Sequence, residues 1–314
     1  MSPKSHFIKV KRENSSRSLA IIIPTRNRPQ LLKNIVSDIL NQTTLPVALI
    51  IVDSSDQESR IERDYRKSTE IHHLYTEIHS AAIQRNIGLD FIERNYRNLS
   101  YVAFLDDDVR IASNYAETLI NFLYSNQEYV GVSGIAVGES KVNFKNWATD
   151  LLGITGQEGD ITKAAVNIPV QKGGTLRQVE TSWLIGCSIW KGSIVKGIRF
   201  ETEFYGASIF EDVIFSHTIK KRFASKLAVL SQVILTHELS PIGRPSKYEF
   251  YFQWMSNRIH FQKQFPDDFP LASFYIRNII IGLFFVLSGP MRGFESTKSG
   301  MGILYAILRS LKPK

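Results

Sequence analysis

The chain changes from apolar to acidic within one short stretch, YVAFLDDDV, which spans residues 101–109. The apolar, β-forming start of this stretch predicts a buried strand over residues 101–105. The carboxylates that follow, Asp106, Asp107 and Asp108, repel one another at the end of a core element, which costs stability unless a positive group lies beside them. If the backbone stays extended, Asp106 and Asp108 lie on one side and Asp107 on the other. Ligands of open α/β sheets gather at the carboxyl ends of strands, so the stretch favours a divalent-cation site over a solvated acidic turn.

The segments around this stretch alternate between strand and helix patterns. Apolar runs predict strands at residues 19–24, 47–52, 72–76, 130–137, 183–190 and 227–235, and residues 138–180 read as loops with short strands. Helical spacing predicts helices at about residues 29–40, 79–94, 113–125 and 211–223, and a charged helix that ends near Lys67. Asn27 is the expected cap of the first helix. The alternation predicts an α/β fold with a Rossmann-like, mainly parallel sheet, flanked by helices and joined by right-handed crossovers.

Polar side chains follow three of the expected strands, at residues 25–28, 53–56 and 106–108. The carboxyl ends of parallel strands meet at one edge of a sheet, so these tips are expected to share an edge. Asp53 can accept hydrogen bonds from a ribose or a base there, although such an Asp is often only a turn former. Arg85, at the start of a helix, can contact a phosphate or pair with the acidic edge; a surface ion pair is the alternative.

Three further side chains can carry chemistry. Glu211 and Asp212 open a helix and can supply a general base, or simply complement the helix dipole. His237 follows a strand and can bind metal or phosphate, or be structural. A Mg²⁺ or Mn²⁺ ion held by one or two carboxylates and completed by a diphosphate fits Asp106 and Asp108, whereas zinc is disfavoured because no Cys/His cluster has suitable spacing.

The composition is that of a globular protein: 314 residues, 43% hydrophobic and 22% charged. The single cysteine, Cys187, excludes an internal disulfide framework and suits a reducing compartment. The basic N-terminus lacks the apolar core of a signal peptide, so secretion is not expected and a cytoplasmic location is.

The net charge of +8 is concentrated at the two ends of the chain. Residues 1–17 carry five Lys and Arg against one acid, and residues 241–314 carry ten against four, which leaves −2 for residues 18–240. A nucleic-acid-binding core would place its basic surplus in the folded middle, so a nucleic-acid partner is disfavoured and an anionic membrane surface fits better. We therefore expect a basic arm (1–17), a catalytic body (18–240) and a basic helical extension (241–314).

The extension contains two apolar segments. The uninterrupted run 279–287 is too short to span a bilayer. Residues 303–311 can form an amphipathic helix that lies on the inner face of a membrane. For both segments the alternative is packing onto the core or onto a second copy of the chain.

These stretches together resemble family 2 glycosyltransferases. The similar segments, in the order and rough spacing of that family, are Ile22–Arg28, Ile51–Asp53, Arg85–Gly88, Phe104–Asp108, Trp183–Gly186 and Phe210–Asp212. The resemblance covers about residues 18–240 and implies a GT-A fold, with a nucleotide-binding half (18–110) and an acceptor-side half (111–240). It also implies inverting transfer from a nucleotide-diphosphate sugar, assisted by Mg²⁺ or Mn²⁺.

Carried over by position, the resemblance implies a role for each site residue. The residues that would hold the nucleoside are Pro24, Thr25, Arg28 and Asp53; Arg85 and Asp107 would lie near the nucleotide, and Asp106 would face the ribose. Asp108 and His237 would lie at the metal, and Asp212 would be the general base. The residues expected on the acceptor side are Trp183, Gly186 and Glu211. The second strand lacks the acidic pair and glycine common in the family, so donor preference does not carry over. The family's Arg-Asn pair is shifted here, which leaves Arg258 open.

The expected function is glycosyl transfer to a saccharide or lipid-linked saccharide in surface polysaccharide or glycolipid synthesis. Two alternatives stay open: an inactive nucleotide-sugar-binding module, and a nucleotidyltransferase on a related sheet, although its Gly-rich phosphate loop is missing. The basic charge alone supports a third, a nucleic-acid-binding protein. The sequence leaves the oligomeric state open.

Overall fold

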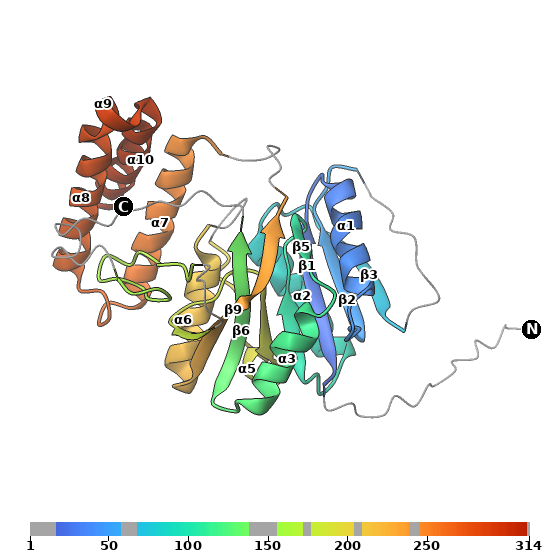
Figure 1. Cartoon of the computed structure of the whole chain (residues 1–314). Coiled ribbons are helices and arrows are strands. Elements are labelled where there is room, and N and C mark those ends of the chain that lie inside the picture. Colours follow the sequence, from blue (N-terminus) through green and yellow to red (C-terminus); the bar gives the residue numbers. More distant parts are fainter. Residues whose placement is uncertain are drawn as a thin grey trace, which may run out of the picture.

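The computed structural model describes residues 17–57, 68–137, 156–171, 177–203, 209–238 and 245–312 (Figure 1). The basic arm up to residue 16 and the helix expected to end near Lys67 lie outside the described residues.

The N-terminal half is a parallel sheet in the order β3-β2-β1-β4. Its strands are β1 (Leu19–Thr25), β2 (Ala48–Asp53), β3 (Glu70–Tyr75) and β4 (Tyr101–Phe104). Strands β1, β2 and β4 are buried along their whole length, as their unbroken apolar sequences predict for a sheet covered on both faces.

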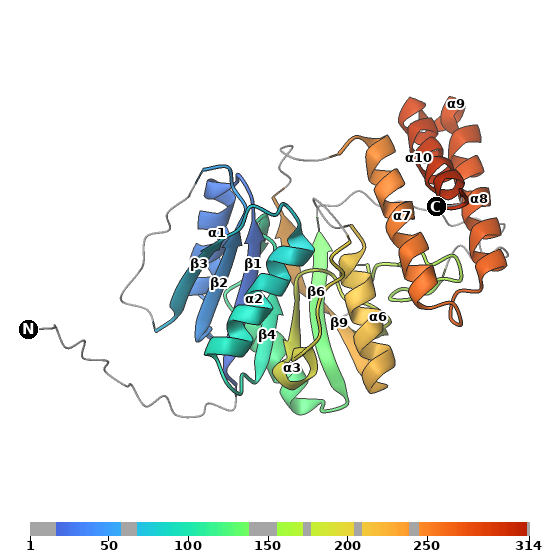
Figure 2. The same ribbon diagram turned by 180° about the vertical axis from the view of Figure 1, so that it is seen from behind.

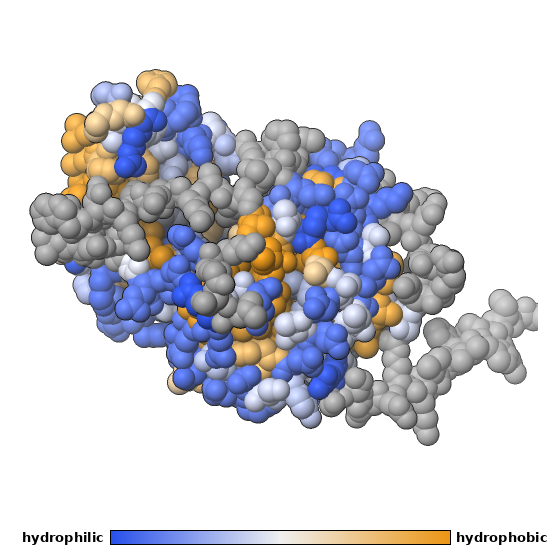
Figure 3. Space-filling model, in the orientation of Figure 1, coloured by the Kyte–Doolittle hydropathy of each residue, from blue (hydrophilic) through white to orange (hydrophobic). Residues whose placement is uncertain are grey.

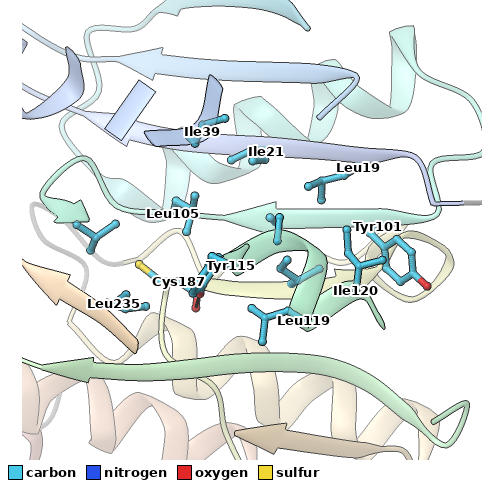
Figure 4. Packing of buried hydrophobic residues seen from close by; sticks show 14 of the residues in the cluster. Leu19, Ile21, Ile39, Tyr101, Leu105, Tyr115, Leu119, Ile120, Cys187 and Leu235 are labelled. Carbon is cyan, nitrogen blue, oxygen red and sulfur yellow. Dashed lines mark hydrogen bonds between the residues drawn. The ribbon is translucent and has the colours of Figure 1, made fainter. Parts of the chain in front are cut away.

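Helices cover both faces of this sheet (Figures 1 and 2). Helices α1 (Pro29–Leu40) and α3 (Tyr115–Ser125) pack on one face, where Leu19, Ile21, Ile39 and Leu119 form part of one apolar cluster (Figure 4). Helices α2 (Ala81–Asn95) and α6 (Glu211–Phe223) pack on the other face through a second cluster. The sheet is therefore the middle layer of a three-layer sandwich, which leaves its strand ends free to carry a site.

The second half of the sheet mixes strand directions. Beyond β4 the order is β8 (Ser188–Lys191), β6 (Tyr129–Val137), β9 (Lys226–His237) and β5 (Val109–Ile111). Strand β7 (Gln178–Thr181) also pairs with β9. A short helix, α5 (Gly192–Val195), follows β8. Strand β8 runs antiparallel to both β4 and β6, whereas β6 and β9 are parallel. The α/β fold class with a helical C-terminal region is confirmed.

The strand expected at residues 183–190 is shorter than predicted. Only its last three residues lie in β8, because the preceding backbone leaves the sheet: the Leu184 N–H donates to Ser216 Oγ on α6, 3.0 Å away. This irregular segment crosses the carboxyl edge of the sheet.

The C-terminal region is helical, as its sequence predicts, with α7 (Lys247–Gln264), α8 (Leu271–Leu287), α9 (Gly289–Arg292) and α10 (Phe294–Ser310). Helix α10 packs between α7 and α8, and small residues allow the close approach: a Cβ on Gly302 would lie 2.5 Å from the Tyr248 carbonyl oxygen, and one on Gly300 2.5 Å from that of Gly282. Within the described residues, no helix combines the length and apolarity that crossing a bilayer requires.

Candidate active site

The three polar tips meet at one edge of the sheet, as the topology predicts. The Thr25 hydroxyl donates to Asp107 Oδ2 at 2.7 Å. Arg28 Nη1 donates to Asp107 Oδ1 at 3.0 Å and to Asp108 Oδ2 at 3.2 Å. The last residue of β1 therefore supplies the hydroxyl, and the loop between β1 and α1 supplies the positive charge, that the acidic turn after β4 requires.

The acidic turn itself differs from the extended segment that we expected. Strand β4 ends at Phe104, and Asp107 and Asp108 form a turn before β5. Asp107 and Asp108 therefore both contact Arg28, whereas Asp106 binds Arg85, so the prediction that Asp106 and Asp108 share one side is wrong. Burial raises the pKa of Asp107 to about 6, although its bonds with Thr25 and Arg28 oppose that rise.

The loop after β1 is fastened to the loop after β2 through Asn27. Asn27 adopts a left-handed backbone conformation (φ 54°), and its side chain donates to Asp56 Oδ2 at 2.7 Å and accepts from the Asp56 N–H at 3.0 Å. Helix α1 instead begins after Arg28, so the predicted Asn27 cap is wrong. The side chain that was expected to close a helix joins two strand ends.

Asp53 is fully buried at the end of β2. Its Oδ1 accepts from the Ser55 N–H at 2.8 Å, and its Oδ2 lies 3.0 Å from His73 Nε2. The His73 ring stacks on Tyr75, with ring centroids 4.6 Å apart. Sequence reasoning missed His73 because a single histidine in a short strand carries no spacing signal.

Gln84 is a second residue that the sequence did not reveal. Its buried side chain donates to the carbonyl oxygens of Thr25, at 2.9 Å, and Val52, at 2.7 Å. These bonds hold the C-terminal ends of β1 and β2 against the first turn of α2. A polar residue at an inward helical position was the only available signal.

Arg85 lies buried between Asp106, which follows β4, and helix α6. Its Nη2 lies 2.5 Å from Asp106 Oδ1, and its Nη1 contacts Glu211. Arg85 therefore pairs with the acidic edge, as one of its expected roles requires, and its contact with a phosphate stays a prediction. Glu211 is buried in this contact and so helps to position Arg85, while its expected place on the acceptor side stays a prediction. A Cβ on Gly186 would lie 3.1 Å from Arg85 Nη2, which explains the glycine at this close approach.

Asp108 and His237 form the candidate metal-binding pair. The two residues are brought together because Val109 pairs with His237 in the β5–β9 ladder, and His237 Nδ1 lies 3.5 Å from Asp108 Oδ1. Burial alone would raise the pKa of Asp108, but the hydrogen bond with His237 and the charge of Arg28 outweigh it and hold that pKa below its ordinary value.

The described residues contain no group of three His, Cys, Asp or Glu side chains arranged to hold a metal ion. A carboxylate beside an imidazole nevertheless suits Mg²⁺ or Mn²⁺ when diphosphate oxygens and water complete the coordination. The donor set therefore fits an ion that arrives with a nucleotide rather than one that the protein holds alone.

A cavity of about 260 Å³ lies where the sheet edge, α6 and α7 meet. Five residues expected from the sequence line it: Asp106, Trp183, Gly186, Asp212 and His237. Phe250 and Trp254 of α7 line it too. The sequence did not reveal their role because an aromatic-rich helix reads as core packing. Residues from the carboxyl edge of the sheet, from the start of α6 and from α7 thus face one space.

Arg258 lies behind Trp254 rather than in the cavity wall. It is fully buried, donates to the Ala165 carbonyl at 2.9 Å and to Asn278 Oδ1 at 2.7 Å, and contacts the Ala164 carbonyl. Its guanidinium carbon lies 4.0 Å from the centroid of the Trp254 ring. Burial lowers the pKa of Arg258 to about 9. Arg258 therefore fixes the orientation of Trp254 and ties α7 to α8.

The sequence of the chain is similar to those of known proteins. The family described as Glycosyl transferase family 2 matches residues 20–180. The GalNAc(5)-diNAcBac-PP-undecaprenol beta-1,3-glucosyltransferase of Campylobacter jejuni subsp. jejuni serotype O:2 is 25% identical over 199 residues, which are 60% of this chain and 56% of that protein. The chain thus spans just over half the length of this relative.

Solved structures show the same fold. S. aureus TarS 1-349 in complex with UDP-GlcNAc aligns with a TM-score of 0.52 and 16% identity over 87% of this chain and 73% of that chain. GalNAc-T7 with UDP, GalNAc and Mn²⁺ aligns with a TM-score of 0.57 and 9% identity over 80% and 48%. At these identities the likeness shows the fold alone, which is GT-A. Because the family match spans just over half of the sequence, the chain belongs to glycosyl transferase family 2.

Proposed function

We propose that this protein is an inverting glycosyltransferase that moves a sugar from a nucleotide-diphosphate donor to a hydroxyl group of a saccharide or lipid-linked saccharide. One observation carries the proposal: Asp106 of the sheet edge, His237 beside Asp108, and Asp212 of α6 line the same cavity. Membership in family 2 supports it, and so does the relative whose name specifies a glucosyltransferase acting on an undecaprenol-linked saccharide.

The donor would bind along the edge formed by β1, β2 and the acidic turn. In this proposal Pro24, Thr25, Arg28 and Asp53 hold the nucleoside, and Asp106 faces the ribose. Arg28 is half-buried and bound to Asp107 and Asp108, so its charge is fixed beside the place where a diphosphate would lie. Asp107 is buried and orients Thr25 and Arg28.

Asp212 would act as the general base. As the acceptor oxygen attacks the anomeric carbon, the bond from that carbon to the diphosphate breaks on the opposite face, and Asp212 takes the hydroxyl proton. Attack from the opposite face inverts the anomeric configuration. A Mg²⁺ or Mn²⁺ ion bound at Asp108 and His237 would offset the charge of the departing diphosphate.

Two tryptophans that line the cavity, Trp183 and Trp254, would bind the acceptor. Trp183 is buried and lines the cavity, and its Nε1 has no hydrogen-bond partner among the described residues, so it can donate to an acceptor hydroxyl. Trp254 offers an aromatic face held in place by Arg258.

Trp254→Ala is expected to raise the acceptor KM about two- to tenfold, because an aromatic contact contributes about 0.5 to 1.5 kcal/mol. Donor affinity should stay unchanged, since Trp254 lies on the α7 side of the cavity. Initial rates at varied acceptor concentration test this, with Trp254→Phe as the conservative control. A variant with a raised donor KM and an unchanged acceptor KM would place Trp254 on the donor side instead.

The direct test of donor binding is thermal unfolding with UDP, GDP and dTDP, each with and without Mn²⁺. One nucleotide should stabilise the protein, by about 2.7 kcal/mol at roughly a hundredfold excess over its Kd. Asp108→Asn should abolish the part that depends on Mn²⁺, whereas Asp90→Asn, which changes a surface carboxylate paired with Arg199, should not. If no nucleotide diphosphate raises the unfolding temperature, the proposal fails; binding without transfer to any acceptor would identify an inactive binding module.

We further propose that the reaction takes place at the inner face of a membrane, in polysaccharide or glycolipid synthesis. The basic composition of residues 241–314 and the lipid-linked substrate in the relative's name support this location.

A further inference from the structure

The outer face of the C-terminal helices exposes an unusual number of large apolar side chains. On α8 these are Ile276, Ile279, Leu283 and Leu287, at the helical spacing of one stripe. The opposite side of α8, with Phe274, Asn278, Ile281 and Phe285, is buried. The stripe is therefore a second apolar face that the fold leaves uncovered, and Figure 3 shows apolar residues along the outer side of this region.

The stripe ends at a short turn with the most exposed apolar side chains. Leu287 ends α8 and is 74% exposed, Met291 of α9 is 86% exposed, and Phe294, which begins α10, is 71% exposed. We call these three residues the apolar tip. Three large apolar side chains within eight residues are thus mostly exposed, and exposed clusters of this kind mark interaction sites.

The charges on the helices that carry the apolar tip are mostly positive. Residues 271–312 contain five cations, Arg277, Arg292, Lys298, Arg309 and Lys312, and one acid, Glu295. Glu295 is paired with Lys298 at 2.7 Å, and Lys298 also lies 5.1 Å from the Phe294 ring centroid. Of the five cations, Arg292 lies within the apolar tip and Lys298 follows Phe294 by four residues. An apolar cluster with cations beside it is complementary to an anionic lipid surface, where apolar side chains enter the acyl boundary and Lys and Arg reach the headgroups.

The position of the apolar tip suits a substrate that sits in a membrane. In Figures 1 and 2, α9 projects beyond the upper end of the sheet, where β6 ends. This end is the edge that carries the acidic turn, because β6 runs parallel to β4: both are antiparallel to β8. A membrane reached by the tip would therefore lie on the side of the molecule toward which the active-site edge faces.

We propose that the apolar tip, with the α8 stripe behind it, docks the protein on an anionic lipid bilayer without crossing it. The proposal rests on the proposed function in one respect, the lipid-linked acceptor. The expectation that residues 303–311 lie on a membrane stays a separate prediction: Ile303, Ala306 and Ile307 are buried against the other helices, whereas Tyr305, Leu308 and Leu311 are exposed.

The test is co-sedimentation of the full chain with vesicles of phosphatidylcholine alone and of phosphatidylcholine with phosphatidylglycerol. The wild type should bind the anionic vesicles, and binding should weaken as salt rises above about 0.1 M. The triple variant Leu287→Ser, Met291→Ser, Phe294→Ser should bind at least about tenfold less, because insertion scales with apolar area. Tyr124→Ser, which alters an exposed aromatic residue on α3, is the matched control and should bind as the wild type does.

Three results would overturn the proposal: no binding by the wild type, equal binding by the triple variant, or equal loss with Tyr124→Ser. Light scattering of the same samples measures the oligomeric state, and so tests whether a second copy of the chain covers this face instead of a membrane. A wild-type oligomer that dissociates in the triple variant, with no vesicle binding, would assign the face to a second copy of the chain. Transfer to a water-soluble saccharide, measured with the wild type without vesicles, tests the proposed function independently.

Discussion

Asp212→Asn is expected to lower the transfer rate by at least about a hundredfold, the usual contribution of a general base. Asn has nearly the same shape as Asp and can still accept the bond that Val213 N–H donates to Oδ1 at 2.8 Å, so the start of α6 should stay intact. What the variant loses is the ability to take a proton from the acceptor. Donor affinity should stay close to that of the wild type.

The measurement is the single-turnover rate with saturating donor and acceptor, together with the nucleotide-induced shift in unfolding temperature. Glu249→Gln is the matched control, because it removes an acid from the first turn of α7 and should leave the rate unchanged. Near-normal transfer by Asp212→Asn would remove Asp212 from the base role. A lost nucleotide shift would instead mean that Asp212 acts in donor binding.

The second large effect is on stability. Arg85→Met should lower the free energy of unfolding by about 3 to 5 kcal/mol, because it leaves Asp106 and Glu211 near each other without their shared cation. Urea unfolding measures the change. Arg199→Met is the control: its partners Asp90 and Glu93 are partly exposed, so the loss should be about 1 kcal/mol or less.

A second substitution separates charge from packing. Adding Glu211→Gln to Arg85→Met removes one of the uncompensated carboxylates and should recover part of the lost stability. Equal losses in Arg85→Met and Arg199→Met would show that the buried contact contributes no more than a surface pair. No recovery in the double variant would show that Arg85 acts through packing alone.

The sequence predicted the parts of the fold that depend on periodicity. Unbroken apolar runs such as Ile21–Ile23 and Leu49–Val52 locate buried parallel strands, and topology then brings Thr25, Asp53 and Asp107 to one edge. The cavity-lining residues Asp106, Asp212 and His237 were also identified, because each lies within two residues of the start or end of an element that the pattern predicts.

The site contacts that could not be predicted from the sequence depend on the backbone path of short irregular segments and on how distant elements pack. An extended segment would place Asp106 and Asp108 together, whereas the observed turn brings Asp107 and Asp108 to the same partner, Arg28. No local sequence pattern encodes that turn. The Glu211 contact and the Trp254 wall depend on how α6 and α7 pack, which involves residues far apart in the chain. Gln84 and His73 are single polar residues whose partners are known only once the strands are placed.

The position of Trp254 and Phe250 has a consequence for how this enzyme diversifies. The sheet edge supplies the residues proposed for the donor, whereas one wall of the same cavity comes from α7, outside the nucleotide-binding half. Replacement of surface residues on α7 would reshape the wall proposed for the acceptor without disturbing the strands proposed to hold the donor. We therefore expect that substitutions on α7 can change acceptor choice, whereas Arg258 keeps α7 attached to α8 and to the segment around Ala165.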